Sequence, residues 1–186
     1  MKKIIIIGAP GVGKSTLAGI LHDIARLPVI YLDALYWKPV WRGISKAAWV
    51  TLQQELVQGE EWIIDGNYQS TVDIRLQAAD TIIFLDMPRY LYVWRVIKRQ
   101  FFSWRKYRPD IGEGCVQKIT WRYLYELWNF PTESRKLLLE KLLMVSNKKH
   151  VIQLTSRDEV SHFVRNMRIM YEEKKSPTFM VGDICY

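Results

Sequence analysis

The chain has 186 residues, of which 49% are hydrophobic and 25% charged, and its formal net charge is +8. This is the composition of an ordinary soluble protein, and the length predicts one domain with a substantial core. Two cysteines far apart argue against a disulfide framework, and no apolar run approaches the ~20 residues of a membrane helix. Together with an N-terminal apolar run that stops at Gly8, too short for a secretion signal, these features predict a cytoplasmic protein.

The first predicted element is a buried strand that leads into a glycine-rich turn and then a helix. Ile4 to Ile7 have no polar break, and apolar residues with helical spacing follow the turn: Leu17, Ile20, Leu21 and Ile24. The turn fits G-x-x-x-x-G-K-[ST], the P-loop, with Gly8, Ala9, Pro10, Gly11, Val12, Gly13, Lys14, Ser15 and Thr16. This motif predicts a nest of backbone N–H groups around a polyphosphate, with Lys14 at the β- and γ-phosphates and the Ser15 hydroxyl on Mg²⁺. The alternative is a plain glycine turn with Lys14 in solvent.

Further strands and helices alternate along the rest of the chain. The predicted strands are residues 27–32, 61–65, 81–86 and 150–154. The predicted helices cover about 45–58, 70–79, 88–102, 116–127, 131–143 and 158–172. The stretch 103–114 predicts a mobile loop and 173–186 a loose tail, so residues 1–172 form one predicted domain. The alternation predicts an α/β fold with a parallel sheet and right-handed crossovers.

Polar residues occur at or just beyond the ends of several predicted strands. Sheets of this kind bind ligands outside the carboxyl ends of their strands. We therefore expect one crevice to bring together Lys14, Asp33, Asp65 and Asp86. Pro88 follows Asp86 almost at once, so we interpret Asp86 mainly as a turn residue.

Most of the net charge comes from one short stretch. Seven cations and no acid lie between residues 89 and 108, which leaves +1 for the rest of the chain: Arg89, Arg95, Lys98, Arg99, Arg105, Lys106 and Arg108. Helical spacing puts Arg95, Lys98 and Arg99 on one face, and another face is predicted to hold the apolar residues Tyr90, Val93, Trp94, Ile97 and Phe101. Such a block favours an element that grips phosphate groups, although the total charge also raises nucleic acid as a partner.

The P-loop closely resembles that of adenylate-kinase-like small-molecule kinases. Three further stretches are similar to the DNA topology modulation (FlaR-like) family, a branch of those kinases: LDALYW at 32–37, WIIDGNY at 62–68 and WNFP at 128–131. The resemblance covers about residues 2–164. It implies the nucleoside-monophosphate-kinase type of P-loop fold, with the P-loop strand central in a five-stranded parallel sheet and a helical lid over about 95–115. It also implies ATP and Mg²⁺, but no particular acceptor.

The resemblance suggests roles for three polar residues. Asp65 matches the carboxylate that similar kinases use to hold Mg²⁺ through water; alternatively it is a turn aspartate bonded to its own backbone. Asp33 lies where related kinases place an acid that orients or deprotonates the acceptor; alternatively it is a loop carboxylate paired with a cation. Arg157, with Ser156, matches the segment that packs on adenine, or else begins an ordinary helix.

The basic block resembles the lid of these kinases. The resemblance implies that Arg95, Arg99, Arg105 and Arg108 close over the phosphates, with Arg108 and then Arg95 as the strongest candidates. The alternative is that each arginine is a solvated surface charge.

Aromatic residues occur near the predicted acceptor segment, and they either line an acceptor pocket or pack in the core: Trp37, Trp41, Trp49 and Tyr68.

The favoured function is therefore an ATP- and Mg²⁺-dependent kinase that phosphorylates a small molecule, for instance a nucleotide or nucleoside. The alternative is an ATP-binding, DNA-interacting regulator of DNA topology that has no small-molecule acceptor. The sequence contains no evident helix-turn-helix or basic-aromatic binding module, and this favours the kinase.

Overall fold

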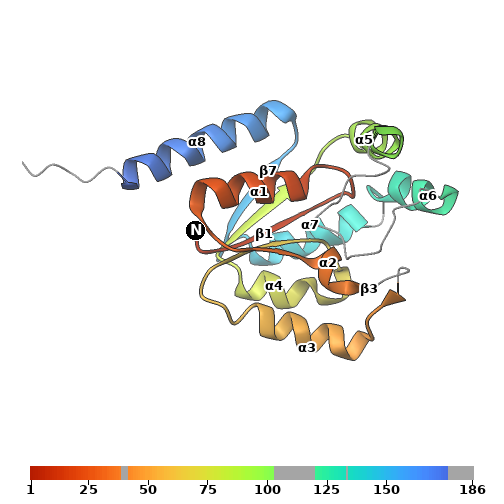
Figure 1. Ribbon diagram of the computed structural model, residues 1–186, viewed down its shortest axis with the longest axis horizontal. Coiled ribbons are helices and arrows are strands. Elements are labelled where there is room, and N and C mark those ends of the chain that lie inside the picture. Colours follow the sequence, from red (N-terminus) through yellow and green to blue (C-terminus); the bar gives the residue numbers. More distant parts are fainter. Residues whose placement is uncertain (39–41, 103–119, 133, 176–186) are drawn as a thin grey trace, which may run out of the picture.

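A five-stranded, wholly parallel sheet forms the centre of the protein, seen in a computed structural model that describes residues 1–38, 42–102, 120–132 and 134–175. The strand order is β2-β5-β1-β6-β7, and β1 and β7 of this sheet are labelled in Figure 1. The strands are β1 (Lys3–Gly8), β2 (Val29–Tyr31), β5 (Trp62–Asp65), β6 (Thr81–Leu85) and β7 (His150–Leu154). The predicted parallel sheet is confirmed, and the strand that leads into the P-loop is its middle strand.

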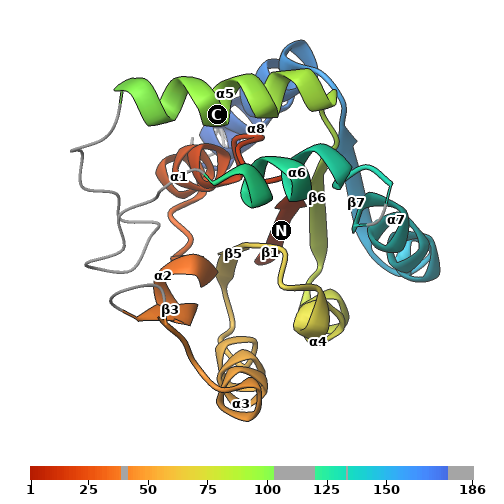
Figure 2. The ribbon, with the colours of Figure 1, turned by 90° about the vertical axis from the view of Figure 1, so that its right-hand side faces the viewer.

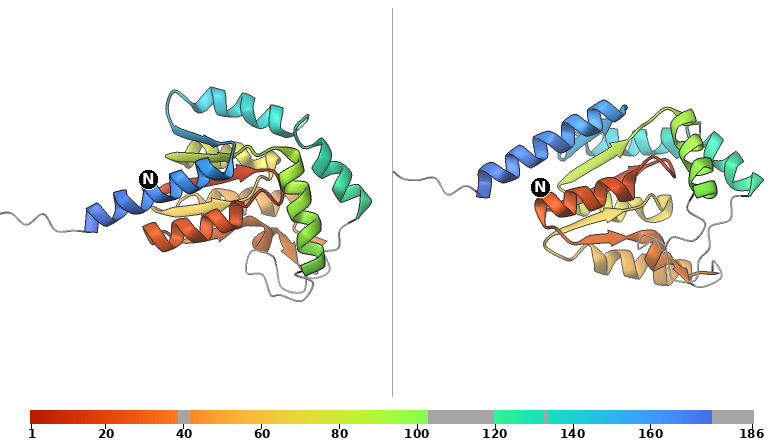
Figure 3. Two further views of the ribbon diagram at one scale, coloured as in Figure 1. Left: turned by 90° about the horizontal axis from the view of Figure 1, so that it is seen from above. Right: turned by 45° about the horizontal axis from the view of Figure 1, so that its top comes forward.

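Helices cover both faces of this sheet. Those longer than two turns are α1 (Lys14–Ala25), α3 (Lys46–Leu56), α5 (Arg89–Phe102), α6 (Trp121–Asn129), α7 (Ser134–Val145) and α8 (Arg157–Lys175). The shorter α4 spans Val72–Ala78. In Figure 3, α1 and α8 run side by side over one face, and α5 lies crosswise at the end where α1 begins. The helices α3, α4 and α7 lie on the other face (Figure 1).

The core is built on β1. Ile4 to Ile7 are fully buried, as are Ile63 and Ile64 of the neighbouring β5. Side chains of a strand alternate between the two faces of the sheet, so a strand with a helical layer on each side needs an unbroken apolar run. The buried strand β1 ends at Gly8, the first residue of the P-loop, so the core fixes the point at which the loop begins.

Small elements gather at the carboxyl end of the sheet. Figure 2 looks onto this end, where α2 (Leu32–Tyr36) and the two-residue strand β3 (Trp37–Lys38) lie below α5 and α6. β3 pairs antiparallel with β4 (Arg42–Gly43), and the 3₁₀ turn η2 (Gln69–Thr71) precedes α4. The sequence predicted no strands between residues 34 and 43, because two-residue strands have no alternation to detect.

The predicted apolar face of α5 is wrong in part. Val93 packs against the core as predicted, but the buried residues are Tyr92 and Val96, whereas Tyr90 and Trp94 are 66% and 61% exposed. Apolar side chains occur on nearly every side of this helix, so the spacing alone does not choose the buried face. Packing of Val96 against the P-loop makes that choice.

Several predictions fall on residues outside the described ranges. These are the predicted loop 103–114 with Arg105 and Arg108, the first residues of the helix predicted over 116–127, and Trp41. Residues 176–186 of the predicted tail also lie outside, whereas residues 173–175 belong to α8. None of the helices in the described part of the chain is long and apolar enough to cross a membrane.

Candidate active site

The P-loop has a backbone that only glycine adopts easily at two key positions. Gly8 has φ 146°, and a Cβ there would lie 2.4 Å from the carbonyl oxygen of Leu85. Gly11 has φ 77°, and a Cβ there would lie 2.4 Å from Cγ2 of Val96 on α5. Because a side chain at either position would be strained and would clash, the close turn depends on both glycines.

Lys14 lies across the mouth of this loop. Its ammonium donates hydrogen bonds to the carbonyl oxygens of Gly8 and Ala9, both at 3.0 Å. α1 begins after Gly13 without a side-chain cap, so its first N–H groups are not taken by a capping residue. A helix N-terminus and a lysine ammonium together favour an anion at this point.

Ser15 and Asp65 meet beside the loop. The Ser15 hydroxyl donates to Oδ2 of Asp65 at 2.6 Å, and Asp65 is the buried last residue of β5. Hydroxyl and carboxylate oxygens suit Mg²⁺, which proteins commonly hold with one or two side chains plus substrate phosphates. Among the described residues no group of three or more His, Cys, Asp or Glu could hold a metal by itself. The pair therefore fits Mg²⁺ bound jointly by the protein and a phosphate.

Asn67 ties the segment after β5 to the P-loop. Its side-chain amide donates to the Gly8 carbonyl at 2.7 Å, and its Oδ1 accepts from the Gly8 N–H at 2.9 Å. The sequence pointed to Asn67 only as part of the stretch 62–68, with no role of its own. The contact joins residues 59 positions apart, and no local pattern reports such a pairing.

Asp33 lies on α2, at the acceptor side of the predicted crevice. Its Oδ1 accepts a 2.8 Å hydrogen bond from the Tyr68 hydroxyl. Burial, and then the negative charge of Asp33, raise the pKa of Tyr68, so the hydroxyl keeps its proton and remains a donor. Within the described residues the hydrogen-bond partner of Asp33 is thus a tyrosine rather than the cation that the alternative interpretation required.

The predicted pocket aromatics pack against one another. Tyr36 contacts the rings of Trp37, Trp49 and Tyr68 at centroid distances of 4.8, 5.0 and 4.9 Å. Trp49 is buried and its ring also lies 4.7 Å from that of Tyr68. Trp49 is therefore a packing residue of this aromatic cluster. Trp37 and Tyr68 are only partly buried, so part of each side chain stays accessible.

Of the predicted arginines, Arg95 contacts the P-loop. Its Nη1, on α5, donates to the Val12 carbonyl at 2.5 Å. Burial, and then the positive charge of Arg157, lower the pKa of Arg95. Arg157 is exposed at the start of α8. Arg99 belongs to α5, but its side chain lies outside the described part, as does Arg108.

Asp86 does more than form a turn. Its two carboxylate oxygens accept from Nε and Nη2 of Arg135, each at 2.7 Å, and Oδ2 also accepts from Gln153 at 2.7 Å. These contacts tie β6 to α7 and β7. Asp86 therefore has a structural ion pair, and the structure does not direct it to the P-loop crevice as the sequence led us to expect.

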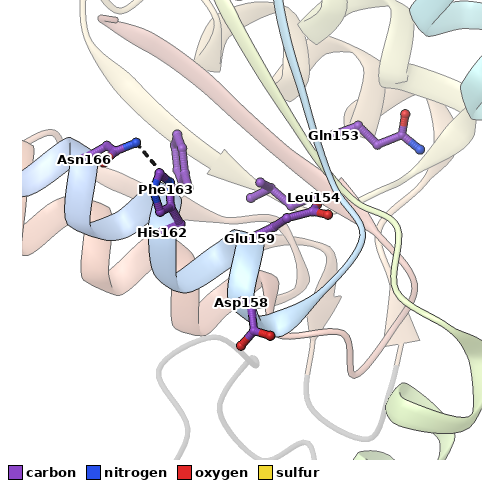
Figure 4. Close-up of a pocket in the computed structure, with 7 residues that line it drawn as sticks. All are labelled: Gln153, Leu154, Asp158, Glu159, His162, Phe163 and Asn166. Carbon is purple, nitrogen blue, oxygen red and sulfur yellow. Dashed lines mark hydrogen bonds between the residues drawn. The ribbon is translucent and has the colours of Figure 1, made fainter.

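A separate groove of about 570 Å³ lies between β7 and α8. Its lining is Gln153, Leu154, Asp158, Glu159, His162, Phe163 and Asn166 (Figure 4). Asn166 contacts His162 at 3.2 Å, and Glu159 accepts from the backbone and hydroxyl of Thr155. No P-loop residue lines this groove, so it is distinct from the site around Lys14.

Comparison with solved structures shows which fold this is. Shikimate kinase from Acinetobacter baumannii, in complex with shikimate, matches with a TM-score of 0.55 and 14% identity, over 94% of this chain and 95% of that one. The chain shares the fold of P-loop kinases. Shikimate kinase from Bacteroides thetaiotaomicron matches with a TM-score of 0.53 and 16% identity, over 91% and 97% of the two chains. A gluconokinase from Sinorhizobium meliloti 1021 gives 0.50 and 14%, over 93% of each chain. No protein-family model matches the chain, and no curated protein does.

Proposed function

We propose that the protein transfers a phosphoryl group from ATP, with Mg²⁺, to a small-molecule acceptor. The observation that supports this most directly is the 2.6 Å contact between Ser15 and Asp65 beside the P-loop. Hydroxyl and carboxylate oxygens are hard ligands of the kind Mg²⁺ prefers, and these two lie beside the loop that would bind the β- and γ-phosphates of a triphosphate. Asp33 lies at the same end of the sheet, on the segment that follows β2.

In the proposed reaction each of the site's side chains has its own role. Lys14 would leave its loop carbonyls to contact the β- and γ-phosphates, while Arg95 and Arg157 would offset charge on the donor side. Ser15 and Asp65 would hold Mg²⁺, which neutralises phosphate charge when bound. Asp33 would orient the acceptor hydroxyl and take its proton as the oxygen attacks the γ-phosphorus, while the bond from the γ-phosphorus to the bridging oxygen breaks and ADP leaves. Arg99 and Arg108 stay proposed lid contacts.

The solved neighbours support a small acceptor, and the sequence motifs bear on the branch of kinases. The names of the solved neighbours state that they act on shikimate or gluconate, both small molecules. The motifs at 32–37, 62–68 and 128–131 favour membership of the FlaR-like branch, and two of these three stretches contribute Asp33, Asp65, Asn67 and Tyr68 to the site. The acceptor itself is best sought among hydroxylated metabolites, nucleosides and nucleotides.

Lys14→Ala tests the proposed function. We expect ATP-dependent phosphorylation to fall about 10²-fold or more, because one preorganised contact to the transferring group is lost, while the melting temperature stays near that of wild type. The measurement is ADP release and ³¹P NMR of the product with a panel of hydroxyl acceptors.

Lys136→Ala is the matched control, since Lys136 is an exposed lysine on α7, and it should retain full activity. If the wild-type protein gave only slow ATP hydrolysis with every acceptor class in the panel, the kinase proposal would be wrong.

A further inference from the structure

Arg75 is a fully buried arginine on α4 that bonds three consecutive carbonyl oxygens. Nη1 donates to Gly66 at 2.5 Å, and Nη2 donates to Asn67 at 2.5 Å and to Tyr68 at 3.2 Å. The sequence does not point to this residue, because an arginine in an amphipathic helix is usually exposed and no local pattern shows that this one is buried. Its contacts fall entirely on the segment that follows β5.

Arg75 carries its charge inside the protein. Burial lowers the pKa of Arg75 to about 10, so the side chain is still charged at neutral pH. Its Nε has no hydrogen-bond partner among the described residues, and burying a charge with an unsatisfied donor is costly. The bonds of its two Nη atoms offset that cost, and every one of them holds the main chain of the segment 66–68.

The segment held by Arg75 joins both halves of the site. Asp65, just before it, accepts from Ser15; Asn67 pairs with the backbone of Gly8; and Tyr68 donates to Asp33. Its backbone is unusual as well, because Gly66 has φ 141° and Tyr68, a non-glycine residue, has φ 35°. A conformation of this kind persists only where its surroundings hold it in place.

We propose that Arg75 is a positioning residue that fixes the segment 66–68, and through it sets the distance between the P-loop and the acceptor-side Asp33. This rests on the proposed kinase function. Arg75 does not touch the reacting groups; it acts through Asn67 on the donor side and through Tyr68 on the acceptor side. A guanidinium suits this task, because its planar fork of donors can reach several carbonyl oxygens at once.

The first test compares MgATP binding by Arg75→Met and Arg75→Lys with wild type, using calorimetry at a temperature where all are folded. We expect Arg75→Met to weaken MgATP binding about ten-fold or more, the range seen when a residue that orients a metal ligand is lost. Arg75→Lys should recover part of the loss, since it keeps the charge but has one nitrogen. The matched control is Lys141→Met. Lys141, on α7, forms an ion pair with Asp73, which lies on α4 as Arg75 does, and this variant should bind MgATP normally.

Hydrogen exchange separates positioning from mere support of α4. In Arg75→Met we expect faster amide exchange at residues 65–68, in the P-loop and in α2, and no comparable change in Lys141→Met. The effects of Arg75→Met and Asn67→Ala on MgATP affinity should also be non-additive, because both act on one contact with Gly8. Faster exchange confined to α4, with unchanged MgATP affinity, would overturn the proposal. These readouts need no acceptor, so a failed acceptor screen would refute the kinase function without altering this result.

Discussion

Gly11 is the residue where the P-loop and α5 meet. Its Cα lies so close to α5 that an added Cβ would come within 2.4 Å of Val96 Cγ2 and within 3.1 Å of the Tyr92 carbonyl oxygen. Arg95, between those two residues, bonds the carbonyl of Val12. The helix that carries the basic block is thus packed directly on the phosphate-binding loop, and a change at one reaches the other.

Gly11→Ala should lower the free energy of unfolding by roughly 2–4 kcal/mol, from a strained positive φ and the clash with buried Val96. The double variant with Val96→Ala should lose about 1 kcal/mol less unfolding free energy than the sum of the two single variants, because the shorter side chain at position 96 removes the clash. Urea unfolding measures both quantities. Gly19→Ala is the control, since this helical glycine has room for a Cβ and alanine there should be neutral or stabilising. Strict additivity would show that the contact with Val96 does not matter.

At the scale of single residues, the sequence pointed to candidate site residues that belong to a local pattern. Lys14 and Ser15 belong to a contiguous pattern, and Asp65 ends an apolar strand, so each carries a local signal. Asn67 and Arg75 do not, because their importance comes from contacts with main-chain atoms that only the folded chain brings together. The pairing of Asp86 with Arg135 was missed for the same reason.

Among the elements, β1 and β6 are joined at their starts by one carboxylate. Asp80 accepts hydrogen bonds from the N–H groups of Lys2 and Lys3 at 2.7 and 2.9 Å, and from the Thr81 hydroxyl at 2.6 Å. Burial alone would raise the pKa of Asp80, but the bonds from Thr81, Lys3 and Lys2 outweigh it and lower that pKa. The carboxylate therefore stabilises the folded state in its ionised form.

Asp80→Asn should lower the free energy of unfolding by about 1–2 kcal/mol at pH 7, since bonds to a charged acceptor are weakened. The folded-state pKa lies below the unfolded value of about 3.9, so this contribution is complete above that pH and is lost as pH falls through the folded pKa. Urea midpoints should thus differ by a constant amount above about pH 5 and converge at lower pH. Asp23→Asn, at an exposed position on α1, is the control. A difference that stayed the same down to low pH would contradict the role of the charge.

Element prediction succeeded where the pattern was long. The isoleucine-rich strands are found within a residue or two of their expected bounds, and Ser45 caps α3 as predicted, accepting from Ala48 N–H at 3.3 Å. It failed for β3 and β4, which are too short to show a period, and for α5, whose buried face is set by contact with Gly11. Long-range packing decided the second case, because Gly11 and Val96 are far apart in the sequence.

For the whole molecule, one end of the sheet collects the groups that the proposed phosphoryl transfer would use. The carboxyl end of β1 supplies the P-loop, β5 supplies Asp65 and the segment held by Arg75, and the residues after β2 supply Asp33. These three strands are adjacent in the order β2-β5-β1, so one strand separates the strand that leads to the P-loop from the strand that leads to Asp33. The proposed donor and acceptor sides thus lie at the same end of the sheet, with Asp65 and the segment held by Arg75 between them.

The net charge of +8 allows a direct test of the DNA-interacting alternative. A local block of cations predicts weak, sequence-independent binding to duplex DNA at low salt, falling log-linearly as salt rises, because counterions released from the phosphates drive it. If the protein is a kinase, fluorescence anisotropy should detect no complex near about 0.15 M salt, MgATP should not strengthen binding, and Lys14→Ala should bind DNA like wild type. A complex that survives this salt concentration and tightens with MgATP in wild type but not in Lys14→Ala would instead show an ATP-controlled DNA-binding protein, because only then would the P-loop and the basic block act together on nucleic acid.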